Sequence, residues 1–285
     1  MTDFRRTLPK HTIEGMPVSA FAKNQLKYKP SNAKVFARRY TDNFLMFIEY
    51  DGSGFSGWQK QPGARTVQQD IENALSRLGF KNAGVVAAGR TDSGVHALKQ
   101  AVSLTLHKAL PAGFDLGYSL NSVLPADISI ISVERKKSVF NARYKAKLKV
   151  YRYDIWNSPW RSVWRGKNAW HIPKPLNTVY MEKAARCLLG KHDFSAFDAS
   201  GSAQDNKTAL IKKISIKRSK GKLSLRFIGD RFLYKMVRNI VGALVRAGVA
   251  KIRPEQMKDI LLSRDRNKAG QTAPAEGLFM EEIIF

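Results

Sequence analysis

The feature of this chain that most constrains its fold is a repeated change between two hydrophobic periods. Apolar side chains occupy every second position from Phe44 to Tyr50, as in a strand, and Asp51-Gly52 then form a turn. From the capping box Thr66 to Gln69 onward the period is helical, until Gly79 stops it. The residues on this helical face are Val67, Ile71, Ala74, Leu75 and Leu78. Further strands are predicted over 85–88, 101–106 and 128–133.

The second half of the chain repeats this plan. A strand is predicted over 151–156, a helix over 181–189, a β-hairpin over 211–227 with its turn at Lys220-Gly221, and a longer helix over 231–248. We therefore expect an α+β fold of two similar α/β halves with mixed antiparallel sheets, related by a pseudo-twofold, with a cleft between them as the natural place for a site. The predicted segments are a basic flexible leader (1–43), an N-terminal half (44–143) and a C-terminal α+β half (150–285).

The charge of the chain is strongly unbalanced. Lys and Arg total 49 against 23 Asp and Glu, a formal net charge of +26, which points to a polyanionic partner, nucleic acid ahead of an anionic membrane surface. Apolar stretches such as 240–245 are far shorter than the ~20 residues of a spanning helix, so we expect no membrane protein. Cys187 is the only cysteine and the five histidines stand singly. This predicts a metal-free protein of a reducing compartment, the cytoplasm.

The leader, residues 1–43, has a different composition from the rest. It contains three prolines and shows no sustained period of 2 or 3.6. We expect a flexible basic arm that touches RNA phosphates. Two alternatives stay open: an unremarkable extension, or an organelle import peptide, which its arginines suit but Asp3 and Glu14 do not.

The predicted helix over 231–248 has an apolar arc and a basic stripe. The apolar arc comprises Leu233, Met236, Val237, Ile240, Val241, Leu244 and Gly248. The stripe on the opposite side comprises Arg231, Lys235, Arg238 and Arg246, with Gly242 in its middle. Because every charge on this face is positive, we expect it to contact phosphates, with Gly242 letting a bulky partner come close. The alternative is an ordinary solvated face.

Two loops carry unusual sequence. Gly52 to Gly57 fits the spacing G-x-G-x-x-G, but the next helix starts only at Thr66, so we expect a tight loop with aromatic anchors Phe55 and Trp58 rather than a nucleotide site. Residues 88–97, between two predicted strands, contain Asp92 with Arg90 two residues before it. A lone carboxylate in a basic cleft should ionise easily and can act as a nucleophile or base, although an Asx-turn is the alternative. His96 is expected to be a hydrogen-bonding loop residue.

The chain resembles the tRNA pseudouridine synthase A family in a series of ordered motifs that covers roughly residues 44–285. The motifs are Glu49-Tyr50-Asp51-Gly52, Gly57-Trp58-Gln59, Gly89-Arg90-Thr91-Asp92, Gly94-Val95-His96, Phe140-Asn141-Ala142-Arg143, Tyr151-Arg152-Tyr153, Leu188-Leu189-Gly190, Asp193-Phe194, the run from Met236 to Gly242, and Ala275-Glu276-Gly277-Leu278.

This resemblance implies a pseudouridine synthase fold whose N-terminal half carries Asp92 as nucleophile. Asp92 would attack either the ribose anomeric carbon or the uracil ring. The glycosidic bond to nitrogen breaks, the uracil rotates and a carbon–carbon bond forms, with no net redox change and therefore no cofactor. Arg238 would be the ion-pair partner of Asp92. The residues that the resemblance implies for substrate binding are Tyr151, Arg90, Arg143 and Leu278. For Tyr151 and Leu278, ordinary core packing is the alternative.

The implied activity is that of an intramolecular isomerase that converts uridine to pseudouridine in the tRNA anticodon stem-loop, at positions 38 to 40. The expected partners are tRNA and a second copy of the chain, since the family is homodimeric, with no membrane and no nucleotide cofactor. Two alternatives stay open: a catalytically silent RNA-binding protein on the same scaffold, and a synthase acting on other uridines. Asp92, Tyr151 and Arg238 favour the enzyme, because a pure binder has no reason to keep all three.

Overall fold

The computed structural model describes residues 41–137, 140–201 and 205–285, which all fall in one compact unit. The predicted leader therefore lies outside the described residues, apart from its last three. Among the helices of the described part, none is long and apolar enough to cross a membrane.

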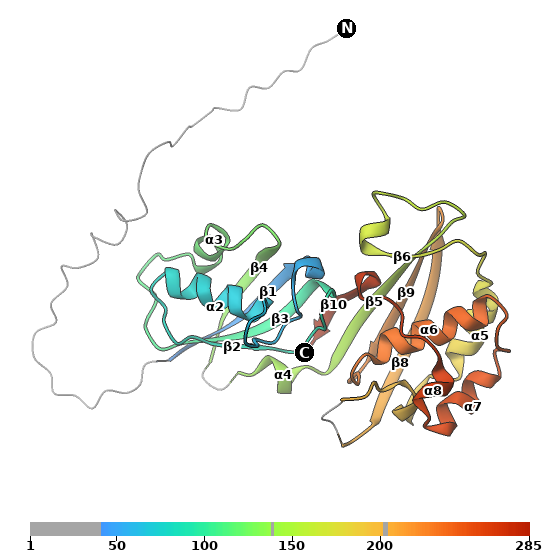
Figure 1. Cartoon of the computed structure of the whole chain (residues 1–285). Coiled ribbons are helices and arrows are strands. Elements are labelled where there is room, and N and C mark those ends of the chain that lie inside the picture. The colour runs from blue at the N-terminus through green and yellow to red at the C-terminus, as the bar shows by residue number, and fades with distance from the viewer. Residues whose placement is uncertain (1–40, 138–139, 202–204) are drawn as a thin grey trace, which may run out of the picture. The chain divides into compact units, whose positions relative to one another are not determined.

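The described strands form one mixed sheet, whose main path is β4-β1-β3-β10-β5-β9-β8-β7, with β2 beside β3 and β6 beside β5 (Figure 1). The first half supplies β1 (Asp42–Tyr50), β2 (Gly84–Ala87), β3 (His96–Leu106) and β4 (Ile128–Lys136). The second half supplies β5 (Leu148–Asn157), β6 (Trp170–Ile172), β7 (Gly190–Asp193), β8 (Thr208–Ser219), β9 (Lys222–Gly229) and β10 (Leu278–Ile284). The predicted α+β class with mixed strand pairing is confirmed.

Strand β10 lies at the centre of the sheet and joins its two halves. It pairs in parallel with β3, where Phe279 faces His96, and antiparallel with β5, where Met280 faces Tyr151. The two halves therefore share one continuous sheet rather than closing separate ones. Their pseudo-twofold relation and the boundaries at 143 and 150 stay predictions.

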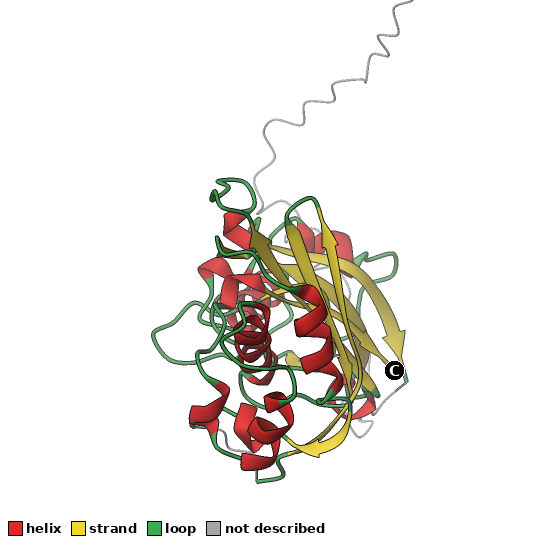
Figure 2. Cartoon of the chain, turned by 90° about the vertical axis from the view of Figure 1, so that its right-hand side faces the viewer, coloured by secondary structure: helices red, strands yellow, loops and turns green. Residues whose placement is uncertain are grey.

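Figure 2 shows most of the helices gathered on one side of the sheet. They are α2 (Val67–Arg77), α3 (Leu116–Asn121), α4 (Ala142–Lys145), α5 (Thr178–Arg186), α6 (Met236–Gly248), α7 (Gln256–Ser263) and α8 (Arg266–Ala269), with 3-10 turns η1 (Gly52–Gly54), η2 (Gly166–Asn168), η3 (Ser195–Phe197) and η4 (Ala275–Gly277). Helix α2 begins where predicted, because the Thr66 hydroxyl accepts a bond from the Gln69 N–H. The Gln69 side chain bonds to Asn73 instead, so only half of the capping box forms.

The β8–β9 hairpin turns at the predicted pair. Lys220 and Gly221 have φ values of 45° and 79°. Positive φ at both central residues gives the twist that a two-residue hairpin needs, and glycine adopts it without strain.

Helix α6 starts at Met236, so the prediction that it begins at Arg231 is wrong. The Asp230 carboxylate accepts bonds from the N–H groups of Arg231 and Leu210, and Lys235 has a left-handed φ of 55°. These side-chain bonds compete with the helical ones and delay the helix. The predicted apolar arc is buried throughout. Arg231 and Lys235, however, precede the helix and do not share a helical stripe with Arg238 and Arg246.

Gly242 also has a different role from the expected one. A Cβ at this position would lie 2.0 Å from the carbonyl oxygen of Gln271. The backbone of residues 271–273 packs against α6 there, and the Ala273 N–H donates to the Arg238 carbonyl at 3.1 Å. The glycine therefore admits the chain's own backbone rather than a bulky partner.

Candidate active site

Asp92 lies on the Asp loop, which we define as residues 88–95 between β2 and β3. A second loop, the Gly loop of residues 52–58, packs on it through hydrogen bonds. The Trp58 N–H donates to the Thr91 carbonyl at 3.0 Å, and the Gly94 N–H donates to the Phe55 carbonyl at 3.3 Å. The Ser93 hydroxyl bonds to the same Phe55 carbonyl at 3.2 Å. These bonds hold Asp92 from both sides.

The glycines of the Gly loop make this close packing possible. A Cβ at Gly52 would lie 2.1 Å from the Val95 carbonyl oxygen, and one at Gly57 would lie 2.7 Å from the Thr91 carbonyl oxygen. Gly57 also has a φ of 91°. Phe55 and Trp58 are buried, so the predicted loop with two aromatic anchors is confirmed. The glycine spacing therefore serves to support the Asp loop.

His96, at the start of β3, ties the Gly loop to η4. Burial lowers its pKa, so the neutral ring accepts from the Gly52 N–H at Nδ1, 3.1 Å away. Its Nε2 then donates to the Glu276 carbonyl at 3.2 Å. The Asp51 carboxylate, 3.0 Å from Nδ1, can pair with the ring only when the ring is protonated. The predicted role as a hydrogen-bonding loop residue is confirmed.

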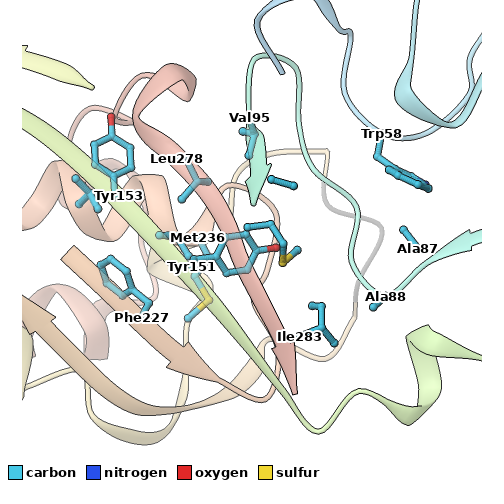
Figure 3. Packing of buried hydrophobic residues seen from close by; sticks show 14 of the residues in the cluster. Trp58, Ala87, Ala88, Val95, Tyr151, Tyr153, Phe227, Met236, Leu278 and Ile283 are labelled. Atoms are coloured by element: carbon cyan, nitrogen blue, oxygen red, sulfur yellow. The ribbon is translucent and has the colours of Figure 1, made fainter. Parts of the chain in front are cut away.

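A cavity of about 800 Å³ opens above the Asp loop. It brings together several predicted site residues from distant parts of the sequence: Asp92, Arg90, Arg143, Tyr151, Leu278 and Lys235. Figure 3 shows Tyr151, Leu278 and Met236 gathered in this region, and all three line the cavity. In the described part of the chain, no group of three or more His, Cys, Asp or Glu side chains could hold a metal ion.

Asp92 and Arg238 form an ion pair at the edge of this cavity. Arg238 Nη1 lies 3.8 Å from Asp92 Oδ2, and Arg238 Nε donates to the Ala273 carbonyl at 2.7 Å. Burial raises the pKa of Asp92, while the charges of Arg238 and Lys235 lower it only in part. Desolvation outweighs the two cations, so this carboxylate ionises less easily than the basic surroundings alone predict.

Tyr151 forms one wall of the cavity from β5. Its ring packs edge-to-face against Phe232 at 5.1 Å between centroids, and burial raises the pKa of its hydroxyl. Leu278 is buried on the neighbouring strand β10. Arg90 and Arg143 are exposed at the rim, and Arg143 lies on α4.

The other predicted basic residues are spread more widely. Lys235 lines the cavity, with its ammonium 4.9 Å from the ring centroid of Tyr234. Arg246 Nη1 donates to the Lys268 carbonyl at 2.6 Å, within the C-terminal half. Arg231 does not line the cavity, and its N–H is bonded to Asp230.

The sequence reasoning missed Lys149, which also lines the cavity. It lies on β5 two residues before Tyr151, so both side chains point to the same face of the sheet. Burial, together with the charges of Arg143 and Arg231, lowers the pKa of Lys149 to about 8 against the opposing effect of Asp230. The period-2 spacing from Tyr151 is the signal that could have identified it.

Comparison with known proteins gives a consistent result. A family model described as tRNA pseudouridine synthase matches residues 46–145 and 184–285. A protein of Thermoanaerobacter sp. (strain X514) is 41% identical over 243 residues, which cover 85% of this chain and 99% of that protein. Proteins of Acetivibrio thermocellus and Moorella thermoacetica are each 42% identical, covering 85% and 84% of this chain and 99% and 97% of their own lengths. All three are named tRNA pseudouridine synthase A.

Proposed function

Because the chain belongs to the tRNA pseudouridine synthase family and isomerises uridine to pseudouridine in tRNA, we propose that its target uridines lie in the anticodon stem-loop, at positions 38 to 40. The identity of about 40% over nearly the full length of proteins named tRNA pseudouridine synthase A supports this target. Substrate and product contain the same atoms, so the reaction consumes no co-reactant.

We propose Asp92 as the nucleophile. The observation that carries this assignment is its position in the cavity, held by two loops and paired with Arg238 at 3.8 Å. The carboxylate must be ionised to attack, and the guanidinium favours that form against the effect of burial. Arg238 itself is fixed by Ala273, so the pair has a defined orientation.

The remaining cavity residues would bind the extruded nucleotide. An enzyme that acts on a base in folded RNA must take it out of its stack. We propose that the uracil stacks on Tyr151 with Leu278 beside it, and that Arg90 and Arg143 at the rim hold the strand from which it was extruded. Buried apolar walls with cations at the entrance suit a base attached to a polyanionic backbone.

We further propose that Arg231, Lys235 and Arg246 contact RNA phosphates, and that two copies of this chain grip one tRNA in the cytoplasm. The net charge of +26 supports a large electrostatic contact with RNA. Light scattering of the free protein and of its tRNA complex measures the number of copies directly. A single copy in both samples would contradict the dimer.

The test of the reaction uses an unmodified tRNA transcript with uridines at positions 38 to 40. Incubation without added metal or nucleotide, followed by carbodiimide modification and primer extension, should give stops at those positions. Asp92→Ala and Asp92→Asn should give none while binding tRNA nearly as tightly as the wild type. Stops at other positions would contradict the proposed target, and residual turnover in Asp92→Ala would contradict the nucleophile.

A further inference from the structure

Lys149 is a half-buried cation that the reaction as described does not use. Its side chain enters the cavity from β5 and lies against the first residues of the Asp loop, since a Cβ at Gly89 would be 3.4 Å from Lys149 Nζ. That part of the loop is fixed, because the Gln100 side chain donates to the Gly89 carbonyl at 2.7 Å. The ammonium therefore lies beside Gly89, three residues before Asp92 on the same loop.

The charges around Lys149 are mostly of its own sign. Arg143 of α4 and Arg231 after β9 both disfavour its ammonium form, and Asp230 is the acidic group that favours it. The Asp230 carboxylate already accepts two backbone N–H groups. Within the described residues, Lys149 Nζ makes no ion pair and no hydrogen bond. A half-buried charge without a partner is unfavourable, so an anion at this position would stabilise the ammonium.

We propose that Lys149, with Arg143 beside it at the cavity entrance, forms a subsite for one RNA backbone phosphate next to the target uridine. This inference rests on the proposed function, because the anion belongs to the strand that enters the cavity. Neighbours two residues apart on a strand are separated by about 6.6 Å. A base stacked on Tyr151 would therefore have Lys149 at its side and not beneath its ring. The sugar-phosphate backbone of the same nucleotide would run along that side.

Filling this subsite changes the protonation of Lys149. Burial and the two arginines hold the pKa of the free protein's Lys149 at about 8, and a bound phosphate must raise it. Arginines stay protonated throughout this range, so Lys149, whose pKa is about 8, is the subsite cation that loses its charge. RNA binding should therefore weaken as the pH rises above about 8.

The experiment combines variants of Lys149 with substrates that lack one phosphate charge. The tRNA is assembled by ligation with a neutral methylphosphonate on the 5′ or the 3′ side of the target uridine. Each carries a 2′-deoxy residue before the modified linkage, and the same deoxy tRNA with natural phosphate is the control. The proteins are the wild type, Lys149→Gln and the conservative Lys149→Arg.

On the natural tRNA, Lys149→Gln should lower kcat/KM by about 10- to 100-fold, mainly through KM, as expected for loss of one charge-assisted bond. One of the two methylphosphonates should lower wild-type kcat/KM to a similar extent and have little further effect on Lys149→Gln. Lys149→Arg should retain most activity and lose the decline above about pH 8.

If each methylphosphonate lowers kcat/KM by the same factor in Lys149→Gln as in the wild type, the proposed subsite is overturned. An unchanged kcat/KM of Lys149→Gln on the natural tRNA would also overturn it. If Lys149→Gln does not fold, the wild type alone still tests the subsite. If its kcat/KM declines above pH 8 on both methylphosphonate substrates as strongly as on the natural tRNA, the subsite is overturned. A wild type that forms no pseudouridine on any substrate would instead contradict the proposed function.

Discussion

Replacing Gly242 by alanine separates helix propensity from packing. In an isolated helix, Gly→Ala is favourable by about 1 kcal/mol. In α6, however, the new Cβ would lie 2.0 Å from the Gln271 carbonyl oxygen, which is backbone and cannot rotate away. Either the helix or residues 271–273 must move by more than ~1 Å to restore ordinary contact.

The cost of this movement follows from the contacts it breaks. Overpacking a core costs about 1–3 kcal/mol. The bond from the Ala273 N–H to Arg238 contributes about 1 kcal/mol, and the guanidinium bond back to the Ala273 carbonyl somewhat more. With partial loss of both bonds and the helical gain subtracted, we expect Gly242→Ala to destabilise the protein by about 2–4 kcal/mol.

Urea unfolding followed by circular dichroism measures this change, provided that the m-value is the same as in the wild type. Gly117→Ala is the matched control, because Gly117 is also helical but its Cβ would meet Val133 Cγ2 at an ordinary 3.4 Å. The control should be neutral or more stable by up to about 1 kcal/mol. If Gly242→Ala is as stable as Gly117→Ala, the result contradicts the close packing of residues 271–273 against α6.

Two further predictions concern the charged groups of the cavity. Arg238→Gln removes the cation paired with Asp92 and so raises the pKa of that carboxyl further. Because the proposed nucleophile must be ionised, the acidic limb of the kcat/KM profile should move to higher pH, and an unmoved limb would contradict the ion pair. Lys235→Gln should lower the slope of log Kd against log salt concentration by about one, whereas an unchanged slope would show that Lys235 makes no phosphate contact.

Local features of the sequence predicted the local structure well. The alternation from Phe44 to Tyr50, the cap at Thr66 and the Lys220-Gly221 turn each depend on a few adjacent residues, and each forms as expected. The start of α6 was misplaced because the apolar period continues back to Leu233, while the competing bonds of Asp230 are invisible in that period.

Features that depend on distant residues were not predictable in the same way. Strand β10 pairs with β3 through residues about 180 positions apart, and its first three residues are all buried, so they show no alternation. The motifs predicted that Arg238 pairs with Asp92, and the two side chains do lie 3.8 Å apart, but the burial that raises the pKa of Asp92 depends on the assembled cavity. For the same reason, the contact between Gln271 and Gly242 left no sign in the sequence.

The central position of β10 also sets the order in which the protein can be assembled. Strands β3 and β5 lie on either side of β10, and β10 follows all the other described strands along the chain. During translation, Asp92 and Tyr151 therefore leave the ribosome long before the strand that joins their halves. The emerging chain already carries its basic residues, but the two walls of the cavity come together only when β10 has been synthesised. Such late, long-range pairing is a slow step in folding.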